Sequence, residues 1–80
     1  MGRFLLHNSH DADECGAVYA AFKGGPSPLR RGRALASCLS GDHSIWWLVE
    51  TDRADDAIAL LPHYVAARTT VTHVGDVDIP

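Results

Sequence analysis

The chain lacks long apolar runs and a surplus of basic residues, and each absence excludes a class of protein. No apolar stretch approaches the roughly 20 residues of a membrane-spanning helix, and His7 and Asn8 interrupt the apolar start too early for a secretory signal. We therefore expect a cytoplasmic protein without a membrane partner. Seven Lys and Arg residues stand against ten Asp and Glu residues, a net charge of −3. Nucleic acid is not an expected partner, because binding to its phosphates requires a basic surface.

Cysteines and short catalytic motifs are also scarce. The two cysteines, Cys15 and Cys38, lie 23 residues apart without CxxC spacing, so the sequence predicts neither a disulfide framework nor a zinc knuckle. We expect both thiols to be reduced and buried. The chain has no GxSxG, P-loop or dinucleotide-binding motif. No cofactor is predicted from these patterns, and they identify no catalytic residue.

The residues that are present fit one globular domain covering residues 1–80, with 46% apolar and 21% charged content. A domain of this length buries a marginal fraction of its surface, so it gains stability from a partner. Two segments within it repeat, since residues 4–15 align with residues 46–57 at a constant offset of 42. Each segment is typical of a strand followed by a helix, which predicts two βα units.

The two predicted helices differ in regularity. The first has Asp11 as its N-cap and Glu14 three residues later. Its apolar stripe consists of Cys15, Val18, Tyr19 and Phe22. The second is capped by Thr51 or Asp52, and Pro62 kinks or restarts it. Its buried stripe consists of Ala54, Ala57, Ile58, Leu61 and Val65.

The remaining segments predict one loop, a hairpin that includes the strand of the second βα unit, and a last strand. Residues 24–33 are rich in Gly, Pro and Arg without periodicity, which is typical of a loop. Residues 34–39 and 43–50 flank Ser-Gly-Asp and predict a β-hairpin, and residues 69–79 predict a last strand with Gly75 as a bulge. The order β-α-β-β-α-β predicts an α+β, ferredoxin-like fold, in which a four-stranded antiparallel sheet carries two helices on one face.

A two-residue turn at Gly41 and Asp42 sets the register of this hairpin. It pairs Ser40 with His43, Cys38 with Ile45, Ala36 with Trp47, and Leu35 with Leu48. One face then holds Phe4, Leu6, Leu35, Leu39, Trp46 and Leu48, which the helices cover. The other face is also apolar, so we expect it to form the interface of a homodimer. Its residues are Leu5, His7, Ala36, Cys38, Ile45, Trp47 and Val49.

The order of elements, the length, the hairpin at residues 36–50 and the helix opening at residues 54–57 resemble small uncharacterised members of the dimeric α/β-barrel superfamily. The resemblance covers nearly the whole chain and implies a homodimer packed sheet to sheet. It implies no single activity, because such relatives include muconolactone isomerases, antibiotic-biosynthesis monooxygenases and haem-degrading enzymes. The haem-degrading enzymes have an Asn on the first strand, a Trp on the third strand and a His on the last helix. Here these match Asn8, Trp46 or Trp47, and His63, and the ligand-cavity candidates are Asn8, Trp46, His63 and Tyr64.

A metal site on the sheet is a separate hypothesis. His7, Cys38 and His43 share a face by strand parity, and His73 joins them if the register of the last strand allows it. Imidazole and thiolate are ligands of zinc and copper. The spacing matches no known metal motif, so we favour the simpler interpretation, in which Cys38 packs as a small apolar side chain and the histidines form hydrogen bonds.

Two other groupings have simple structural explanations. Cys15 begins a helix, where a thiol pKa falls, but the neighbouring carboxylates oppose a thiolate and core packing explains the position. Basic residues border the Gly/Pro loop, where a cleft for a carboxylate or phosphate is the alternative to a solvated loop. They are Lys23, Arg30, Arg31 and Arg33.

Three functional hypotheses remain open. The first is an accessory homodimer that binds a small apolar or metal ligand. The second is a cofactor-independent monooxygenase or isomerase whose cleft is lined by His63, Tyr64 or Asn8. The third is a metal-binding protein that uses His and Cys residues on the sheet. A cavity containing Trp46 and His63 would favour the enzyme, whereas converging imidazoles would favour the metal.

Overall fold

One antiparallel sheet of four strands organises the molecule. The computed structural model describes residues 1–80, and the sheet order is β2-β3-β1-β4. The strands are β1 (Gly2–Ser9), β2 (Leu35–Ala36), β3 (Ser44–Thr51) and β4 (Thr69–Val74). All three neighbouring pairs are antiparallel. This small α+β architecture is compatible with the predicted ferredoxin-like arrangement.

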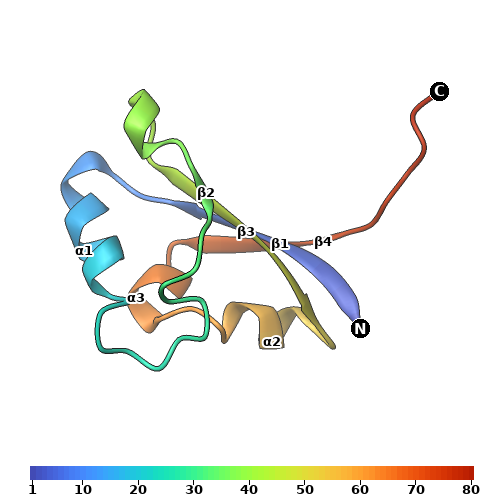
Figure 1. The fold of residues 1–80 in the computed structure, drawn as a ribbon, viewed down its shortest axis with the longest axis horizontal. Coiled ribbons are helices and arrows are strands. Elements are labelled where there is room, and N and C mark those ends of the chain that lie inside the picture. Colours follow the sequence, from blue (N-terminus) through green and yellow to red (C-terminus); the bar gives the residue numbers. More distant parts are fainter.

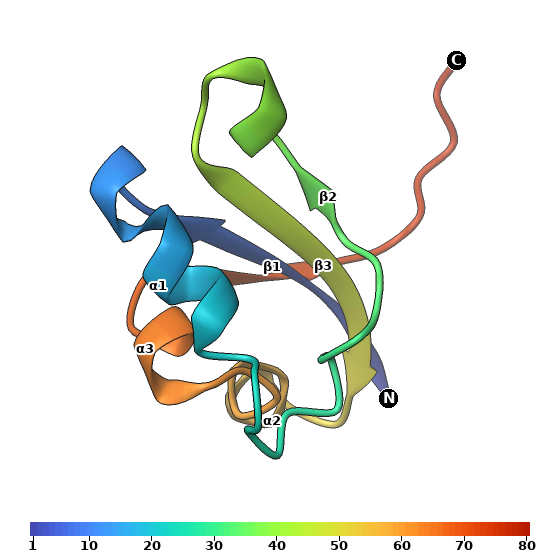
Figure 2. The same ribbon diagram turned by 60° about the vertical axis from the view of Figure 1, so that its left-hand side comes forward.

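Short helices lie on one side of the sheet (Figures 1 and 2). They are α1 (Cys15–Ala20), α2 (Ala54–Ile58) and α3 (His63–Ala66), with 3₁₀ turns η1 (Ala12–Glu14) and η2 (Cys38–Ser40) elsewhere. The predicted interruption at Pro62 is confirmed, because this residue directly precedes α3 and separates it from α2. None of the helices combines the length and the apolarity needed to cross a membrane.

The predicted βα repeat is confirmed. β1 and β3 begin and end 42 residues apart, and helical segments follow both strands. The predicted capping interaction also forms, because the Glu14 carboxylate accepts a hydrogen bond of 2.9 Å from the backbone N–H of Asp11. The two halves of the chain therefore make the same strand-to-helix passage.

The hydrophobic core lies between the sheet and the helices. Leu6, Val18 and Val65 are completely buried there, and removing such side chains from water is the main favourable contribution to folding. These three residues come from β1, α1 and α3. Its seven buried apolar residues are Phe4, Leu6, Val18, Ile45, Ala57, Leu61 and Val65.

The predicted register of the hairpin is wrong. Leu35 pairs with Trp46, and Ala36 pairs with Ile45, because the connection contains more than two residues. Ser37 closes it by donating its N–H to the Ser44 carbonyl at 2.9 Å, and its hydroxyl accepts the Ser44 N–H at 3.1 Å. Within this loop lie η2 and then Gly41, whose φ of 92° favours glycine.

The assignment of β3 to the two faces is also wrong, but for a different reason. The hairpin differs from the expected register by two residues, which leaves each side chain on the same face, whereas the β1–β3 pairing differs from the expected parity by one residue. A shift of one residue turns every side chain of a strand to the opposite face. Residues opposite Phe4, Leu6 and Asn8 lie on the helix-covered face, and these are Val49, Trp47 and Ile45. Ala36, the partner of Ile45, joins them. The face without helices, here called the open face, consists chiefly of Leu5, His7, Leu35, Trp46 and Leu48. Of the predicted interface only Leu5 and His7 lie on this face. Cys38 is in η2, and the other four residues lie on the helix-covered face: Ala36, Ile45, Trp47 and Val49.

The last strand is shorter than predicted. β4 ends at Val74, before Gly75, so this glycine does not form a bulge. Residues 75–80 have no regular structure and extend away from the sheet (Figure 1). One ion pair holds the start of this tail, between Arg3 and Asp76 at 2.9 Å.

Candidate metal centre

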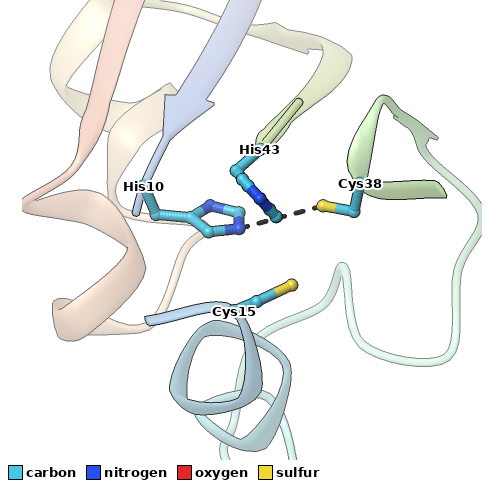
Figure 3. A group of neighbouring side chains, drawn as sticks. All are labelled: His10, Cys15, Cys38 and His43. Carbon is cyan, nitrogen blue, oxygen red and sulfur yellow. Dashed lines mark hydrogen bonds between the residues drawn. The ribbon is translucent and has the colours of Figure 1, made fainter. Parts of the chain in front are cut away.

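Four side chains with metal-binding atoms meet beside one end of the sheet (Figure 3). His10, Cys15, Cys38 and His43 each offer one nitrogen or sulfur atom, and these four atoms all lie within 4.8 Å of one another. His10 is buried and the other three side chains are half-buried. The four residues come from the end of β1, the start of α1, the turn η2 and the approach to β3. Segments far apart in the sequence therefore build a single cluster.

Strand pairing brings the two histidines together. The last pair of the β1–β3 ladder is Ser9 and Ser44, so His10 and His43 occupy the next position outward. The N–H of His10 donates to the His43 carbonyl at 3.1 Å, which continues the pairing. Side chains alternate along a strand, and the preceding Asn8 is buried on the helix-covered face. Both imidazoles consequently point to the side where the helices lie.

Two tight turns bring in the thiols. Cys15 is the first residue of α1, directly after the turn that Glu14 caps, and Cys38 is the first residue of η2. The Sγ atom of Cys38 lies 3.8 Å from Nε2 of His10. Normal zinc bonds to sulfur and nitrogen place tetrahedral ligand atoms about 3.4–3.8 Å apart. A contraction of at most about 1.4 Å would bring all four ligand atoms to that spacing.

Asn8 fixes the protonation of His10. Its Nδ2 donates to the carbonyls of Val65 at 3.2 Å and Arg68 at 3.4 Å, so its Oδ1 must face the imidazole. That oxygen can only accept, and it lies 2.7 Å from Nδ1 of His10. The proton therefore sits on Nδ1, and the lone pair of Nε2 faces the Cys38 thiol. Metal-binding histidines characteristically donate their second N–H in this way.

The second imidazole contains the one buried side-chain nitrogen or oxygen atom that has no hydrogen-bond partner, Nδ1 of His43. Leaving a polar atom buried and unpaired costs about 1–3 kcal/mol. An ion held between the four side chains would give this imidazole a strong partner.

The Cys15 thiol favours its neutral form in the absence of a cation. Burial raises the pKa of Cys15, and the neighbouring Cys38 raises it further. The hydroxyl of Tyr19 donates to Sγ of Cys38 at 3.5 Å. This hydrogen bond, with burial, raises the pKa of Tyr19 to about 12. A divalent cation would favour the thiolates, because it attracts the negative charge that burial opposes.

An ion pair braces the start of α1 against the end of α3. Arg68 lies 2.8 Å from the Glu14 carboxylate and stacks over the Tyr64 ring at 3.8 Å. The backbone hydrogen bond from Asp11 lowers the pKa of Glu14, and Arg68 lowers it further. The segment that carries Cys15 is thus held from both sides.

The predicted metal set is only partly brought together. Cys38 and His43 join the cluster, whereas His7 stacks on Trp46 at 5.0 Å on the open face and donates to or accepts from Ser44 Oγ at 3.1 Å. His73 stacks on Phe4 at 5.0 Å, on the other face.

Sequence reasoning missed His10 and Cys15 as ligands. His10 follows β1 directly and His43 directly precedes β3. Antiparallel pairing of these strands brings such flanking positions together. The positions of His10 and His43 directly outside two paired strands could therefore have identified this pair of imidazoles from the sequence. The sequence does place Cys15 at the start of a helix, but packing in the core is the simpler explanation of a cysteine at that position.

The four ligand-cavity candidates do not line a common cavity. Asn8 is buried among hydrogen bonds on the helix-covered face, while Trp46 lies on the open face. His63 is exposed at the start of α3, and Tyr64 packs against Arg68. This separation gives no support to the monooxygenase or isomerase hypothesis.

Comparisons with protein-family models, with curated proteins and with solved structures find no match to this chain. Function must therefore be inferred from the arrangement of side chains. His10, Cys15, Cys38 and His43 form the one grouping of His, Cys, Asp or Glu residues whose ligand atoms are close enough for a metal ion.

Proposed function

We propose that this protein is a zinc-binding module in which His10, Cys15, Cys38 and His43 hold one Zn²⁺ ion. The convergence of their ligand atoms within 4.8 Å is the observation that carries the proposal. Two thiolates and two imidazoles form one of the usual ligand sets of structural zinc. Two thiolates also cancel the charge of the cation, so the half-buried site would remain neutral, which limits the cost of burial.

Such an ion would have a structural role. Four protein ligands fill a tetrahedral coordination shell and leave no open position for a substrate or an activated water. The ion would tie the end of β1, the start of α1 and the β2–β3 turn to one another. The core holds only seven buried apolar residues, and small domains commonly supplement such a core with a metal.

We also infer that two copies pair through the open face. Leu35 is 76% exposed and Leu48 is 60% exposed, and Leu5 and Trp46 lie beside them on neighbouring strands. Contiguous apolar surface of this kind is typical of an interface. Pairing of a ferredoxin-like sheet with its copy is also what the resemblance to dimeric α/β-barrel proteins implies.

Titration of the purified protein with Zn²⁺ and Co²⁺ tests the zinc site. We expect one ion per chain, and Co²⁺ should give the intense visible bands of tetrahedral coordination together with thiolate charge transfer. Zinc at a hundredfold excess over its dissociation constant stabilises the folded state by about 2.7 kcal/mol. For a domain of this size, this gain raises the melting temperature by about ten degrees or more.

Matched variants separate the site from general metal binding. Cys15→Ser and His43→Gln should each abolish the Co²⁺ spectrum and the thermal shift, whereas His63→Gln should retain both because His63 is exposed and outside the cluster. Absence of a thermal shift in the unsubstituted protein would contradict the proposal. Equal losses in His43→Gln and His63→Gln would contradict it as well.

A further inference from the structure

A cavity of about 220 Å³ lies on the helix-covered side of the sheet, between β2, β3 and the segment from α1 to residue 34. Its walls are largely apolar and include two aromatic rings in contact, Phe22 and Trp47, with centroids 5.9 Å apart. Leu29, Ala36 and Ile45 also belong to the apolar part. Space for a flat apolar group therefore exists beside the edge of the core.

Part of the lining of this cavity is basic. Arg30 and Arg31 line it, and an adjoining hollow that shares both arginines adds Lys23. No Asp or Glu lines either space, and the two salt bridges of the chain involve other arginines, Arg3 and Arg68. Three cations thus gather without carboxylate partners in a chain whose net charge is −3.

Arg31 is held in an unusual backbone conformation. It is the one residue other than glycine with a positive φ, 62°, and a side chain with a Cβ atom adopts this region at a cost. Strained residues of this kind are concentrated at ligand-binding positions, where the geometry of the site requires them. At Arg31 the strain occurs at a basic residue that lines the cavity.

We propose that this cavity binds a small aromatic carboxylate, with its ring packed against Phe22 and Trp47 and its carboxylate at Arg31 and Arg30. Guanidinium groups bind carboxylates through paired, charge-assisted hydrogen bonds. The volume lies below the roughly 300–1,000 Å³ of sites for drug-sized ligands, so the acid is a small one. The apolar walls exclude a ligand that consists of an anion alone.

This site is independent of the zinc proposal in its composition. None of the residues that line the cavity is a proposed zinc ligand. If zinc does not bind, the proposal of a carboxylate site is therefore not contradicted. If the carboxylate does not bind, the zinc proposal is not contradicted. The two sets of experiments distinguish these cases.

Titration with phenylacetate, followed by calorimetry and by tryptophan fluorescence, tests the proposal on the protein as purified. Phenylacetamide keeps the ring without the charge, and acetate keeps the charge without the ring. We expect saturable binding of phenylacetate that is at least tenfold tighter than binding of either control. No binding of phenylacetate, or equal binding of either control, would overturn the proposal.

Two variants locate the binding to this cavity. Arg31→Gly removes the guanidinium and suits the positive φ, so the fold is retained while phenylacetate affinity falls at least tenfold. Arg33→Gly removes the same charge from the same loop but outside the cavity, and should leave the affinity within twofold. Ala36→Leu places a larger side chain in the cavity and should also reduce the affinity at least tenfold. Unchanged affinity in both Arg31→Gly and Ala36→Leu would overturn the assignment.

Discussion

At the scale of single residues, Asn8 connects the fold to the proposed zinc site. Its side chain is completely buried, and it accepts a 2.7 Å hydrogen bond from His10 while donating to the end of α3. Removing an outer hydrogen-bond partner of a metal-binding histidine typically reduces metal affinity 10- to 100-fold. The amide is therefore expected to act on zinc through the imidazole that it orients.

Asn8→Ala should lower zinc affinity about 10- to 100-fold and also destabilise the fold, because the amide no longer pairs with backbone carbonyls. Competition with a chromogenic zinc chelator measures the affinity. Thr69→Val is the matched control, since Thr69 also bonds the Asn8 amide but does not touch His10. It should reduce the melting temperature with little effect on zinc. Equal losses of affinity in both variants would contradict this role of Asn8.

Residue identity allowed some of this site to be predicted. Cys38 and His43 were candidate ligands on the basis of their chemistry alone, whereas His7 and His73 had the same chemistry and lie elsewhere. Which histidines meet depends on the register of β1 and β3, and local sequence does not specify that register when both faces of a strand are apolar. His10 escaped notice for this reason.

At the scale of elements, the β2–β3 turn places Cys38 and His43 in the cluster. Gly41 has a φ of 92° at the end of η2, a conformation that costs other residues about 1–2 kcal/mol. Gly16 in α1 is the opposite case, because a methyl group added there meets nothing within 4 Å. Glycine inside a helix is destabilising relative to alanine by roughly 0.5–1 kcal/mol.

The two glycines should therefore respond in opposite directions to the same substitution. Gly41→Ala should lower the free energy of unfolding by about 1–2 kcal/mol, and Gly16→Ala should raise it by roughly 0.5–1 kcal/mol. Urea denaturation measures both changes. A stabilising effect of Gly41→Ala would show that the turn does not require the left-handed conformation.

Elements with strong local signals could be predicted from the sequence. The capping of the first helix by Glu14, the break at Pro62 and the 42-residue repeat all depend on short-range chemistry. The hairpin was predicted with the wrong turn, because Gly41 and Asp42 suit a two-residue turn as well as a longer loop. Hydrogen bonds between Ser37 and Ser44 stabilise the longer loop. The pattern of apolar residues does not indicate these hydrogen bonds.

At the scale of the whole molecule, the open face predicts a dimer. Leu48 is 60% exposed in the single chain, so Leu48→Glu should leave the protomer folded but place charges in the interface. Light scattering should give twice the 8.6 kDa chain mass for the unsubstituted protein and the single mass for Leu48→Glu. Ala59→Glu, exposed on the helical side, is the control and should remain dimeric. If the unsubstituted protein is a monomer at micromolar concentration, the dimer proposal is wrong.

Tyr19 belongs to both proposed sites, since its ring lines the cavity and its hydroxyl bonds Sγ of Cys38. When zinc converts Cys38 to a thiolate, this hydrogen bond becomes charge-assisted and stronger. Zinc would thereby hold one wall of the cavity more firmly in place. Thermodynamic reciprocity requires that the factor by which zinc changes the affinity for the acid equals the factor by which the acid changes the affinity for zinc. A single tyrosine would thereby couple the supply of a metal to the capture of a metabolite in a chain of 80 residues.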